Sequence, residues 1–531
     1  MHDNADVIII GAGASGAAAA WKLSQHFSNV VCLEQGDWVD PNKYPSTKSN
    51  WELDKTRKFS PFPNIRNLPS DYPINDTNSA ISIANYNAVG GSTILYSAHF
   101  PRMHPSDFST LTLDNVGADW PITYKDLEEF YELNDQIMGV SGLEGDPAYP
   151  NIPNLLPPIG IGQIGEILAK GFNKLKWHWW PSYSAILTRD KNGRSRCQNL
   201  GPCNTGCPQG AKASVDITYW PLNLKNGVKL RTNSRVREII TNSKDEAKGV
   251  IYYDIDGNER VIYSKIIVLA SNGVGTPRIL LNSKSQITQK ELANRSGLVG
   301  KNLMLHPLGF IEGFFSRPFE SNIGPHGSCL LSQEFYETDI SRGFARGFTM
   351  QVLRGSYPLE LVKSGIQRRL IRMGEHHVED FKNIMGSNIG ISIICEDLPE
   401  LSNRVSLDPN LKDSNGIPAP KIDYKLGENT KKMLSFGLKK GKELLNECGA
   451  KNIFAYGPVR NTGWHLMGTT KMGLDRETSV VNKDGMCHDV KNLYIVDSSV
   501  FPTSGGVNPA STIQALALFI SSKIIEHSKN S

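Results

Sequence analysis

The sequence has few cysteines, no long apolar run and almost no net charge. Its 531 residues include eight cysteines, which is too few for a scaffold held together by disulfides. No uninterrupted apolar stretch reaches the roughly 18–20 residues of a membrane-spanning helix. The formal net charge is +4, so bulk charge does not indicate a nucleic-acid-binding protein. The composition, 39% hydrophobic and 21% charged, is that of a globular protein.

The first residues also lack the features of a secretory signal. Residues 1–6 contain no lysine or arginine, and the apolar stretch that follows has no small-residue cleavage site. The sequence therefore predicts a cytoplasmic protein. Export to the periplasm together with a partner that carries the signal would leave the same pattern, and this alternative stays open.

A glycine-rich turn lies between a predicted strand and a predicted helix near the start of the chain. The β-branched run 6–10 favours a buried parallel strand, and residues 17–23 favour a helix. Between them stands Gly11-Ala-Gly-Ala-Ser-Gly16, a spacing that is typical of a dinucleotide-binding turn. The first glycine permits the turn, the second lets a pyrophosphate approach the backbone, and the third lets the helix pack on the strand.

An acidic residue completes this pattern. A second predicted strand, residues 30–33, is followed by Glu34, near the spacing of about 20 residues expected for the acid that binds a ribose. The helix N-terminus offers N–H groups and a partial positive charge to phosphates. The segment predicts a dinucleotide site, without separating NAD from FAD. Its predicted contacts are Gly11, Gly13, Ala14, Ser15, Gly16 and Glu34.

Two segments near the C-terminus carry a second set of motifs. The first contains His465, followed after two residues by Gly468-Thr469. The second contains a predicted strand that ends at Asp497, and then Asn508-Pro509 before a predicted helix. This order resembles the glucose–methanol–choline (GMC) family of FAD-dependent alcohol oxidoreductases. The resemblance implies that FAD is the cofactor and that it is held without a covalent bond.

The resemblance extends along most of the chain and implies further cofactor contacts. Residues 87–93 resemble the first flavin-contacting loop of the family, and residues 235–236 resemble the strand that contacts the adenine. Residues 270–281 resemble its second signature, although Asn272 and Gly273 stand where a glycine and a small residue are usual. The implied contacts outside the glycine-rich turn are Gly90, Gly91, Ser92, Thr93, Val236, Asp497, Asn508, Pro509 and Thr512.

The resemblance also implies an architecture. It implies an α/β protein, α+β overall, in which a Rossmann-like FAD-binding domain is interleaved with a substrate domain built on an antiparallel sheet with helices. The FAD-binding domain would take residues 1–44, 80–120, 222–312 and 456–531. A cover loop and the substrate-binding domain would take residues 45–79, 121–221 and 313–455.

The chemistry of alcohol oxidation assigns roles to two of these residues. A hydroxyl proton and a carbon-bound hydride must leave, and a flavin accepts the hydride. The proton needs a base, for which His465 is suited, while the Asn508 amide cannot act as a base but can orient the substrate oxygen. We expect an FAD-dependent dehydrogenase that oxidises the CH–OH group of an alcohol, polyol or sugar and passes electrons to a non-NAD acceptor. An oxygen-using oxidase and a flavin-containing lyase of the same fold are the alternatives.

Three cysteines crowd into eleven residues and need a local explanation. Cys197, Cys203 and Cys207 stand in a loop rich in Gly, Asn and Pro, and Pro208 follows the last of them. Thiolates are the usual ligands of iron–sulfur clusters. The segment resembles the loop of bacterial FAD-dependent sugar and alcohol dehydrogenases that pass electrons to a cytochrome subunit, which implies a 3Fe–4S cluster on the three thiolates. Zinc with His178 as a fourth ligand, a disulfide with one thiol left over, and reduced structural thiols are the alternatives.

Overall fold

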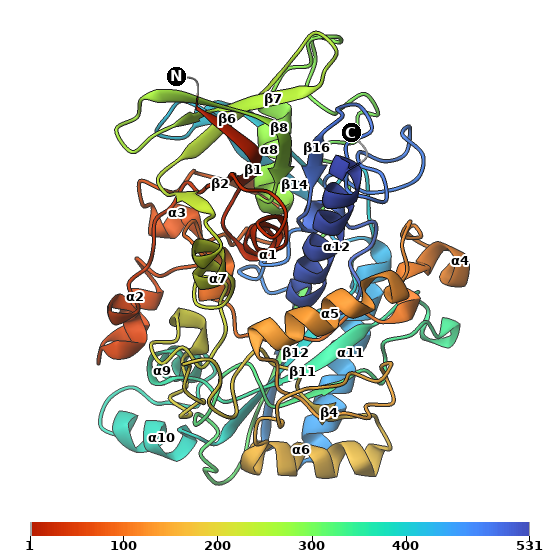
Figure 1. The fold of residues 1–531 in the computed structure, drawn as a ribbon. Coiled ribbons are helices and arrows are strands. Elements are labelled where there is room, and N and C mark those ends of the chain that lie inside the picture. Colours follow the sequence, from red (N-terminus) through yellow and green to blue (C-terminus); the bar gives the residue numbers. More distant parts are fainter. Residues whose placement is uncertain (1–2, 530–531) are drawn as a thin grey trace.

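The computed structural model describes residues 3–529, and it contains three sheets surrounded by helices (Figure 1). The largest sheet has seven strands in the order β5-β2-β1-β8-β7-β6, with β16 paired to β8. β5, β2, β1, β8 and β16 run parallel to one another. β7 pairs antiparallel with β8 on one side and with β6 on the other. The strands are β1 (Asn4–Ile10), β2 (Val30–Leu33), β5 (Lys229–Arg231), β6 (Arg235–Thr241), β7 (Ala247–Tyr253), β8 (Glu259–Leu269) and β16 (Leu493–Ile495).

Helices cover the parallel part of this sheet, which explains its sequence. Residues 7–10 of β1 are buried and β-branched, as a strand covered on both faces requires. Helix α1 (Ala14–Leu23) packs against α12 (Ala510–Lys529), which in turn packs against α5 (Tyr124–Met138). Helices α7 (Tyr219–Lys225) and α8 (Asn272–Asn282) pack against α1 and β6 respectively.

The second sheet has six strands, and all its pairings are antiparallel. Its order is β15-β9-β12-β11-β10-β4, where β15 is Asn452–Tyr456, β9 Leu308–Phe314, β12 Asn388–Cys395, β11 Phe348–Leu353, β10 Leu330–Ser332 and β4 Trp180–Pro181. Helix α11 (Glu428–Glu447) packs on β9, β12 and β11, and α6 (Gly162–Leu175) packs on α11. Met350, Val352, Ile391 and Ile393 belong to the apolar core of this layer.

A third sheet and short helices complete the fold. The sheet has the order β13-β14-β3, with β13 at Arg404–Lys412, β14 at Pro418–Tyr424 and β3 at Asn75–Ser79. The short helices are α2 (Trp51–Lys55), α3 (Pro63–Arg66), α4 (Thr110–Asp114), α9 (Pro358–Gln367) and α10 (His377–Ile384).

The predicted fold class is confirmed. The strands of the seven-stranded sheet come from residues 4–33, 229–269 and 493–495, which all lie inside the segments predicted for the FAD-binding domain. β9 of the six-stranded sheet begins at Leu308, four residues before the predicted segment 222–312 ends. The exact domain boundaries stay a prediction.

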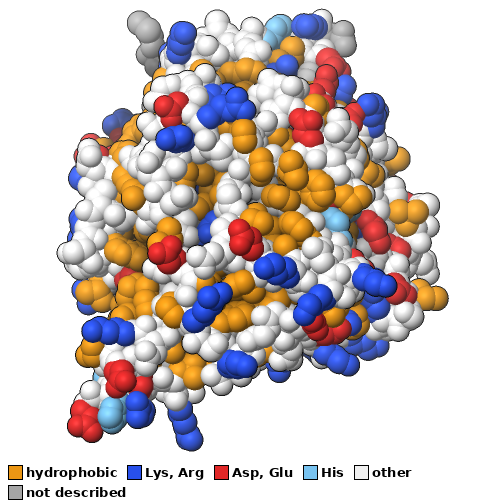
Figure 2. All heavy atoms as spheres, turned by 90° about the horizontal axis from the view of Figure 1, so that it is seen from below, with side chains coloured by type: hydrophobic (Ala, Val, Ile, Leu, Met, Phe, Trp, Pro, Cys, Tyr) orange, Lys and Arg blue, Asp and Glu red, His pale blue; other side chains and the backbone are white. Residues whose placement is uncertain are grey.

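The surface charge and the character of the helices agree with the low net charge and the lack of long apolar runs in the sequence. On the face shown in Figure 2, Lys and Arg side chains are interspersed with Asp, Glu and hydrophobic side chains, and no broad patch of one sign stands out. Between residues 3 and 529, no helix is long and apolar enough to cross a membrane.

Candidate active site

The glycine-rich turn packs as its spacing predicts. Gly11 has φ +106°, and a Cβ atom there would lie 2.6 Å from the carbonyl oxygen of Ala270, which directly follows the neighbouring strand β8. A Cβ atom at Gly16 would lie 1.9 Å from the oxygen of Gly11, so this glycine lets α1 lie directly on the turn. Gly13 differs, because the nearest heavy atom to its Cβ position is the Cα of Gly91 at 4.0 Å. The space beside Gly13 is therefore open to a ligand.

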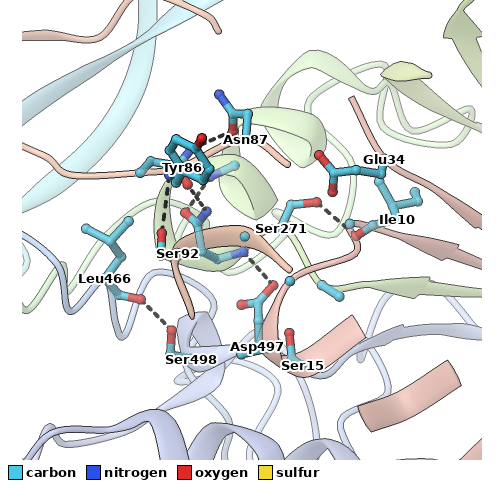
Figure 3. A pocket seen from close by; sticks show the side chains of 18 of the residues that line it. Ile10, Ser15, Glu34, Tyr86, Asn87, Ser92, Ser271, Leu466, Asp497 and Ser498 are labelled. Carbon is cyan, nitrogen blue, oxygen red and sulfur yellow. Dashed lines mark hydrogen bonds between the residues drawn. The ribbon is translucent and has the colours of Figure 1, made fainter. Parts of the chain in front are cut away.

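A cavity beside this turn collects most of the predicted site residues (Figure 3). It runs past the turn and β2 to the C-terminal motifs, so one cavity joins the predicted ribose acid to the predicted base. A ligand that contacts both the turn and the C-terminal motifs, as a dinucleotide would, fits this lining. The predicted site residues that line it are Gly11, Gly13, Ala14, Ser15, Glu34, Gly91, Ser92, Thr93, Val236, His465, Asp497 and Pro509.

Glu34 is buried at the end of β2 and braces the turn. Its two carboxylate oxygens accept hydrogen bonds from the backbone N–H groups of Ala12 and Gly36, each at 2.8 Å. Burial raises the pKa of the carboxyl, and these backbone hydrogen bonds oppose the rise. A carboxylate can accept about four hydrogen bonds, so Glu34 keeps the capacity to accept two ribose hydroxyls.

Asp497 ties the second signature segment to the cavity. It accepts hydrogen bonds from the Asn272 N–H at 3.1 Å, the Thr276 hydroxyl at 2.5 Å and the Ser499 N–H at 2.9 Å. Asn272, one of the two residues that depart from the family pattern, has φ +66°, a conformation that asparagine tolerates better than most residues. Its side-chain oxygen accepts from the N–H groups of Val274 and Gly275 at the start of α8. The departure is therefore compatible with the local backbone.

Four of the residues predicted to bind the cofactor or to act in catalysis do not line this cavity. Gly16 lies beneath the turn, and Gly90 has φ +103° at the start of the loop whose next three residues line the cavity. Thr512 is buried on α12, where its hydroxyl lies 2.8 Å from the Tyr131 hydroxyl of α5. Asn508 is half-buried and directly precedes Pro509. The cofactor and substrate roles given to these residues stay predictions.

The predicted base is paired with a second histidine to which the sequence reasoning gave no role. The Nδ1 atoms of His465 and His306 lie 2.9 Å apart, and the Nε2 atom of His306 lies 2.7 Å from the carbonyl oxygen of Gly505. His306 lies two residues before β9, has φ +50° and is 2% exposed. Its segment, Gly300 to Pro307, resembles the family, and the His-Pro pair at its end is the signal that could have marked it.

The hydrogen-bond partners fix the tautomers of both rings. A carbonyl oxygen only accepts, so the proton of neutral His306 is on Nε2 and its Nδ1 is a bare acceptor. His465 must then donate from Nδ1, which leaves its Nε2 without a proton. A neutral imidazole that lines the cavity and keeps one unprotonated nitrogen is in the form that a general base needs.

The electrostatics of the pair keep both rings neutral. Burial lowers the pKa of His306 to about 4, against which its hydrogen bonds to residues 505 and 504 act. The pKa of His465 lies well below 6.5, because of burial and because His306 is close. Both rings are therefore unprotonated near pH 7, as the tautomer assignment requires.

The three-cysteine loop does not assemble a metal site. Cys197, Cys203 and Cys207 are free thiols in this structure, so it shows none of the three in a disulfide. Across residues 3–529, no three His, Cys, Asp or Glu side chains are grouped so that they could hold a metal ion. The zinc alternative fails at its fourth ligand too, because His178 binds Asp146 through Nε2 at 2.9 Å and the Gln333 N–H through Nδ1 at 3.1 Å. Reduced structural thiols are the hypothesis that agrees with this arrangement.

Comparisons with known proteins show which family the chain resembles. Two family models described as GMC oxidoreductase match residues 166–308 and 399–517. The 2-methyl-1,2-propanediol dehydrogenase of Mycolicibacterium austroafricanum is 39% identical over 523 residues, covering 97% of this chain and 94% of that protein. The fructose dehydrogenase large subunit of Gluconobacter japonicus is 28% identical over 553 residues, covering 99% and 98%.

A solved structure shares the fold at low sequence identity. The crystal structure of pyridoxine 4-oxidase from Mesorbium loti has a TM-score of 0.66 and 15% identity, and the match covers 99% of this chain and 100% of that one. The fold and the cavity define an FAD-binding oxidoreductase. The chain belongs to the GMC oxidoreductase family.

Proposed function

We propose that the protein is an FAD-dependent dehydrogenase that oxidises a CH–OH group to a carbonyl, with His465 as the base. The observation that carries the proposal is the histidine pair, which leaves His465, a residue that lines the cavity, neutral and with an unprotonated Nε2.

The substrate we propose is a small alcohol that carries at least one further hydroxyl, such as a diol, a polyol or a sugar. Two relatives that align over nearly the whole chain are named for a diol and for a sugar. His465 takes the hydroxyl proton through Nε2, and Asn508 orients the substrate oxygen through its amide. FAD bound in the cavity supplies the acceptor for the hydride.

The electron acceptor we propose is a quinone or a protein subunit rather than NAD or oxygen. The relative at 39% identity is named a dehydrogenase, and the fructose enzyme is named as the large subunit of an assembly. These names support an acceptor subunit, such as a cytochrome, for this chain as well. The proposal does not include an iron–sulfur cluster, because the three thiols are not grouped to hold one. Iron and acid-labile sulfide in stoichiometric amounts after anaerobic purification would restore that hypothesis.

The test is reduction of the bound flavin by a panel of diols, polyols, sugars and simple alcohols without oxygen. The reduction is followed by the flavin absorbance at about 450 nm. Bleaching by one class supports the proposal, and a flavin that stays reduced when air is admitted supports a dehydrogenase. Rapid reoxidation with one peroxide per turnover indicates the oxidase alternative. A flavin that no alcohol reduces favours the lyase.

The matched variants are His465→Ala and His376→Ala, which removes an exposed histidine before α10. We expect His465→Ala to keep FAD but to reduce the flavin about 10²–10⁴-fold more slowly, the usual contribution of a general base. His376→Ala should behave as the unaltered protein. Normal flavin reduction in His465→Ala would remove the proposed role of this residue.

A further inference from the structure

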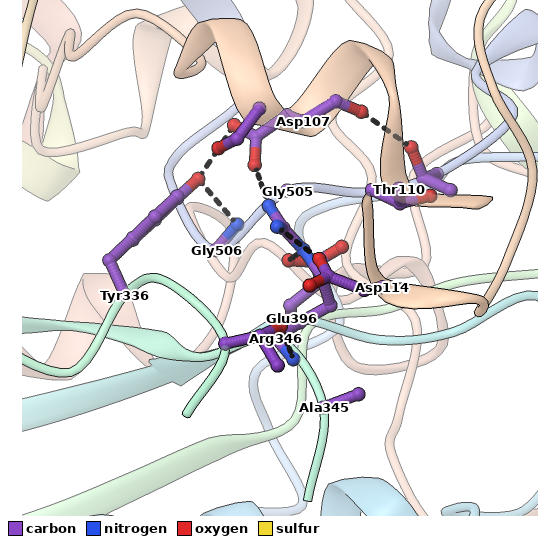
Figure 4. A network of polar contacts seen from close by, with 12 residues as sticks. Asp107, Thr110, Asp114, Tyr336, Ala345, Arg346, Glu396, Gly505 and Gly506 are labelled. Carbon is purple, nitrogen blue, oxygen red and sulfur yellow. Dashed lines mark hydrogen bonds and ion pairs between the residues drawn. The ribbon is translucent and has the colours of Figure 1, made fainter. Parts of the chain in front are cut away.

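One peptide group in the cavity region is held at both ends. The bond between Gly505 and Gly506 places the carbonyl of the first residue and the N–H of the second in one plane, pointing in opposite directions. The Gly505 carbonyl accepts from His306 Nε2 at 2.7 Å. The Gly506 N–H donates to the hydroxyl of Tyr336 at 2.9 Å (Figure 4). His306 and Tyr336 therefore fix the orientation of the same peptide from its two sides.

Tyr336 is anchored in turn by a buried charge network. Its hydroxyl donates to Oδ2 of Asp107 at 2.8 Å, and Asp107 is completely buried. Arg346, also completely buried, forms an ion pair with Asp107 and binds Asp114 at 2.8 Å and Glu396 at 2.9 Å (Figure 4). Because the Gly506 N–H already donates to the Tyr336 oxygen, the Tyr336 hydroxyl donates its own proton to Asp107, which is paired with Arg346.

The five hydrogen-bonding groups form a chain in which every donor points the same way. His465 Nδ1–H donates to His306, and His306 Nε2–H donates to Gly505. Gly506 N–H donates to Tyr336, whose O–H donates to Asp107. Hydrogen bonds aligned in this way polarise one another. No proton is transferred along the chain, but the hydrogen bond donated by Nδ1–H of His465 raises the electron density of its ring. Nε2 of His465 is therefore a better proton acceptor.

We propose that Tyr336 and Asp107 are positioning residues, which act through the Gly505–Gly506 peptide to hold His306 and His465 in the tautomers that leave Nε2 of His465 bare. This inference rests on the proposed role of His465 as the base.

The hydrogen bonds from both sides are needed because the peptide bond between two adjacent glycines can flip easily. A turned peptide would offer an N–H to His306 Nε2 and a carbonyl to Tyr336. Because Tyr336 has committed its proton to Asp107, two oxygens would then face each other with no proton between them. The glycines themselves are required by the close approach, since a Cβ atom at Gly505 would lie 3.1 Å from Asp107 Oδ2 and 3.3 Å from the Tyr336 hydroxyl.

The test compares two tyrosines that share a neighbour. The rings of Tyr336 and Tyr149 both contact the His104 ring, at centroid distances of 4.0 and 4.5 Å, but Tyr149 bonds to Gln333 instead of the peptide. Tyr336→Phe and Tyr149→Phe each remove one hydroxyl. The readouts are FAD content, melting temperature, the rate of anaerobic flavin reduction at saturating substrate, KM and the pH profile of that rate.

We expect Tyr336→Phe to bind FAD and substrate normally but to reduce the flavin about 10- to 100-fold more slowly, with an altered acidic limb of its pH profile. Tyr149→Phe should reduce the flavin at the normal rate. A normal rate and pH profile in Tyr336→Phe overturns the inference. If Tyr336→Phe does not fold, Asp107→Asn is measured in the same way, because its amide could donate to Tyr336 and so reverse the chain. Failure of both variants to fold or to bind FAD assigns the network a purely structural role and also overturns the inference.

His465→Ala, measured alongside, separates this inference from the proposed function. Slow reduction in His465→Ala with normal reduction in Tyr336→Phe overturns the positioning role alone. Normal reduction in His465→Ala overturns the proposed base and the positioning role that depends on it.

Discussion

The Nδ1 atoms of His306 and His465 lie 2.9 Å apart, so one ring must donate to the other. The Gly505 carbonyl decides which one, because it takes the proton of His306 at Nε2. The direction of a backbone carbonyl 199 residues away from His306 thereby sets the protonation of the candidate base. Three predictions test the consequences of this arrangement and of the flavin cavity, and a fourth tests the loop behind the cavity.

The first prediction concerns His306. Replacing it with alanine removes the acceptor for His465 Nδ1–H, so the base can rotate or change tautomer. We expect His306→Ala to keep FAD and to slow flavin reduction about 10- to 100-fold at saturating substrate. His306→Gln offers both an acceptor and a donor and should recover part of the rate. Equal rates in His306→Ala and the unaltered protein would contradict the orienting role.

The second prediction concerns pH. As the proposed base, His465 acts in its neutral form, so we expect activity above its pKa and loss of activity below it. Burial, together with the neighbouring His306, holds this pKa well below 6.5. We therefore expect the rate of flavin reduction to stay constant as the pH falls through 6.5 and to decline only in more acidic solution. A titration of the rate centred at 6.5 would show that His465 has the pKa of an ordinary exposed histidine and would count against the buried pair.

Local spacing explains why part of the site could be predicted. The glycine-rich turn, Glu34 and His465 each stand within a short motif, and the structure brings them to one cavity. His306 and Tyr336 could not be assigned roles in the same way, because their partners at Gly505 and Gly506 lie 199 and 170 residues away. Which segments meet there depends on how the two large sheets are placed around the cavity, and no local pattern encodes that.

The cysteine loop shows that residues close together in the sequence are not necessarily grouped in the structure. Three thiols within eleven residues indicate a common ligand, but closeness in the sequence does not place the sulfur atoms around one centre. A short 3₁₀ turn at Cys203–Thr205 lies between Gly201 and Gly206, which both have positive φ. Cys197 instead turns back on its own segment, where its sulfur accepts from the Asn199 N–H at 3.4 Å. The path of the backbone, not the spacing of the cysteines in the sequence, decides where the three sulfur atoms lie.

The third prediction separates the two roles of glycine in the turn. Gly16→Ala would place a methyl group 1.9 Å from the Gly11 oxygen, so α1 must move off the turn. We expect this variant to be insoluble or to lack FAD and native circular dichroism. Gly13 has φ −80° and ψ −159°, which alanine adopts readily, and its Cβ position is open. Gly13→Ala should keep the native circular dichroism but lose most of its FAD, because the methyl group occupies the space beside the pyrophosphate turn. Full FAD content in Gly13→Ala would contradict the assignment of that space to the cofactor.

The fourth prediction concerns a buried lysine that links the cysteine loop to the flavin loop. Lys212 follows the third cysteine by five residues and is 2% exposed. Its ammonium donates to the carbonyls of Thr93, Ile94 and Tyr96 at 3.3, 2.7 and 2.9 Å. Thr93 lines the cavity, so Lys212 holds the wall of the cofactor site from behind.

We expect Lys212→Met to leave these carbonyls buried without a donor, at a cost of about 1–3 kcal/mol or more in the free energy of unfolding. The same change should lower the FAD content, because the loop that carries Thr93 loses its anchor. Denaturant unfolding and the ratio of flavin to protein absorbance measure the two effects. Lys125→Met, which removes a lysine that is 86% exposed, is the matched control and should change neither. Full stability and full FAD content in Lys212→Met would show that the lysine does not support this wall. The loop would then be held by its other contacts, such as the hydrogen bond from the Thr93 hydroxyl to the Gly90 carbonyl at 2.6 Å.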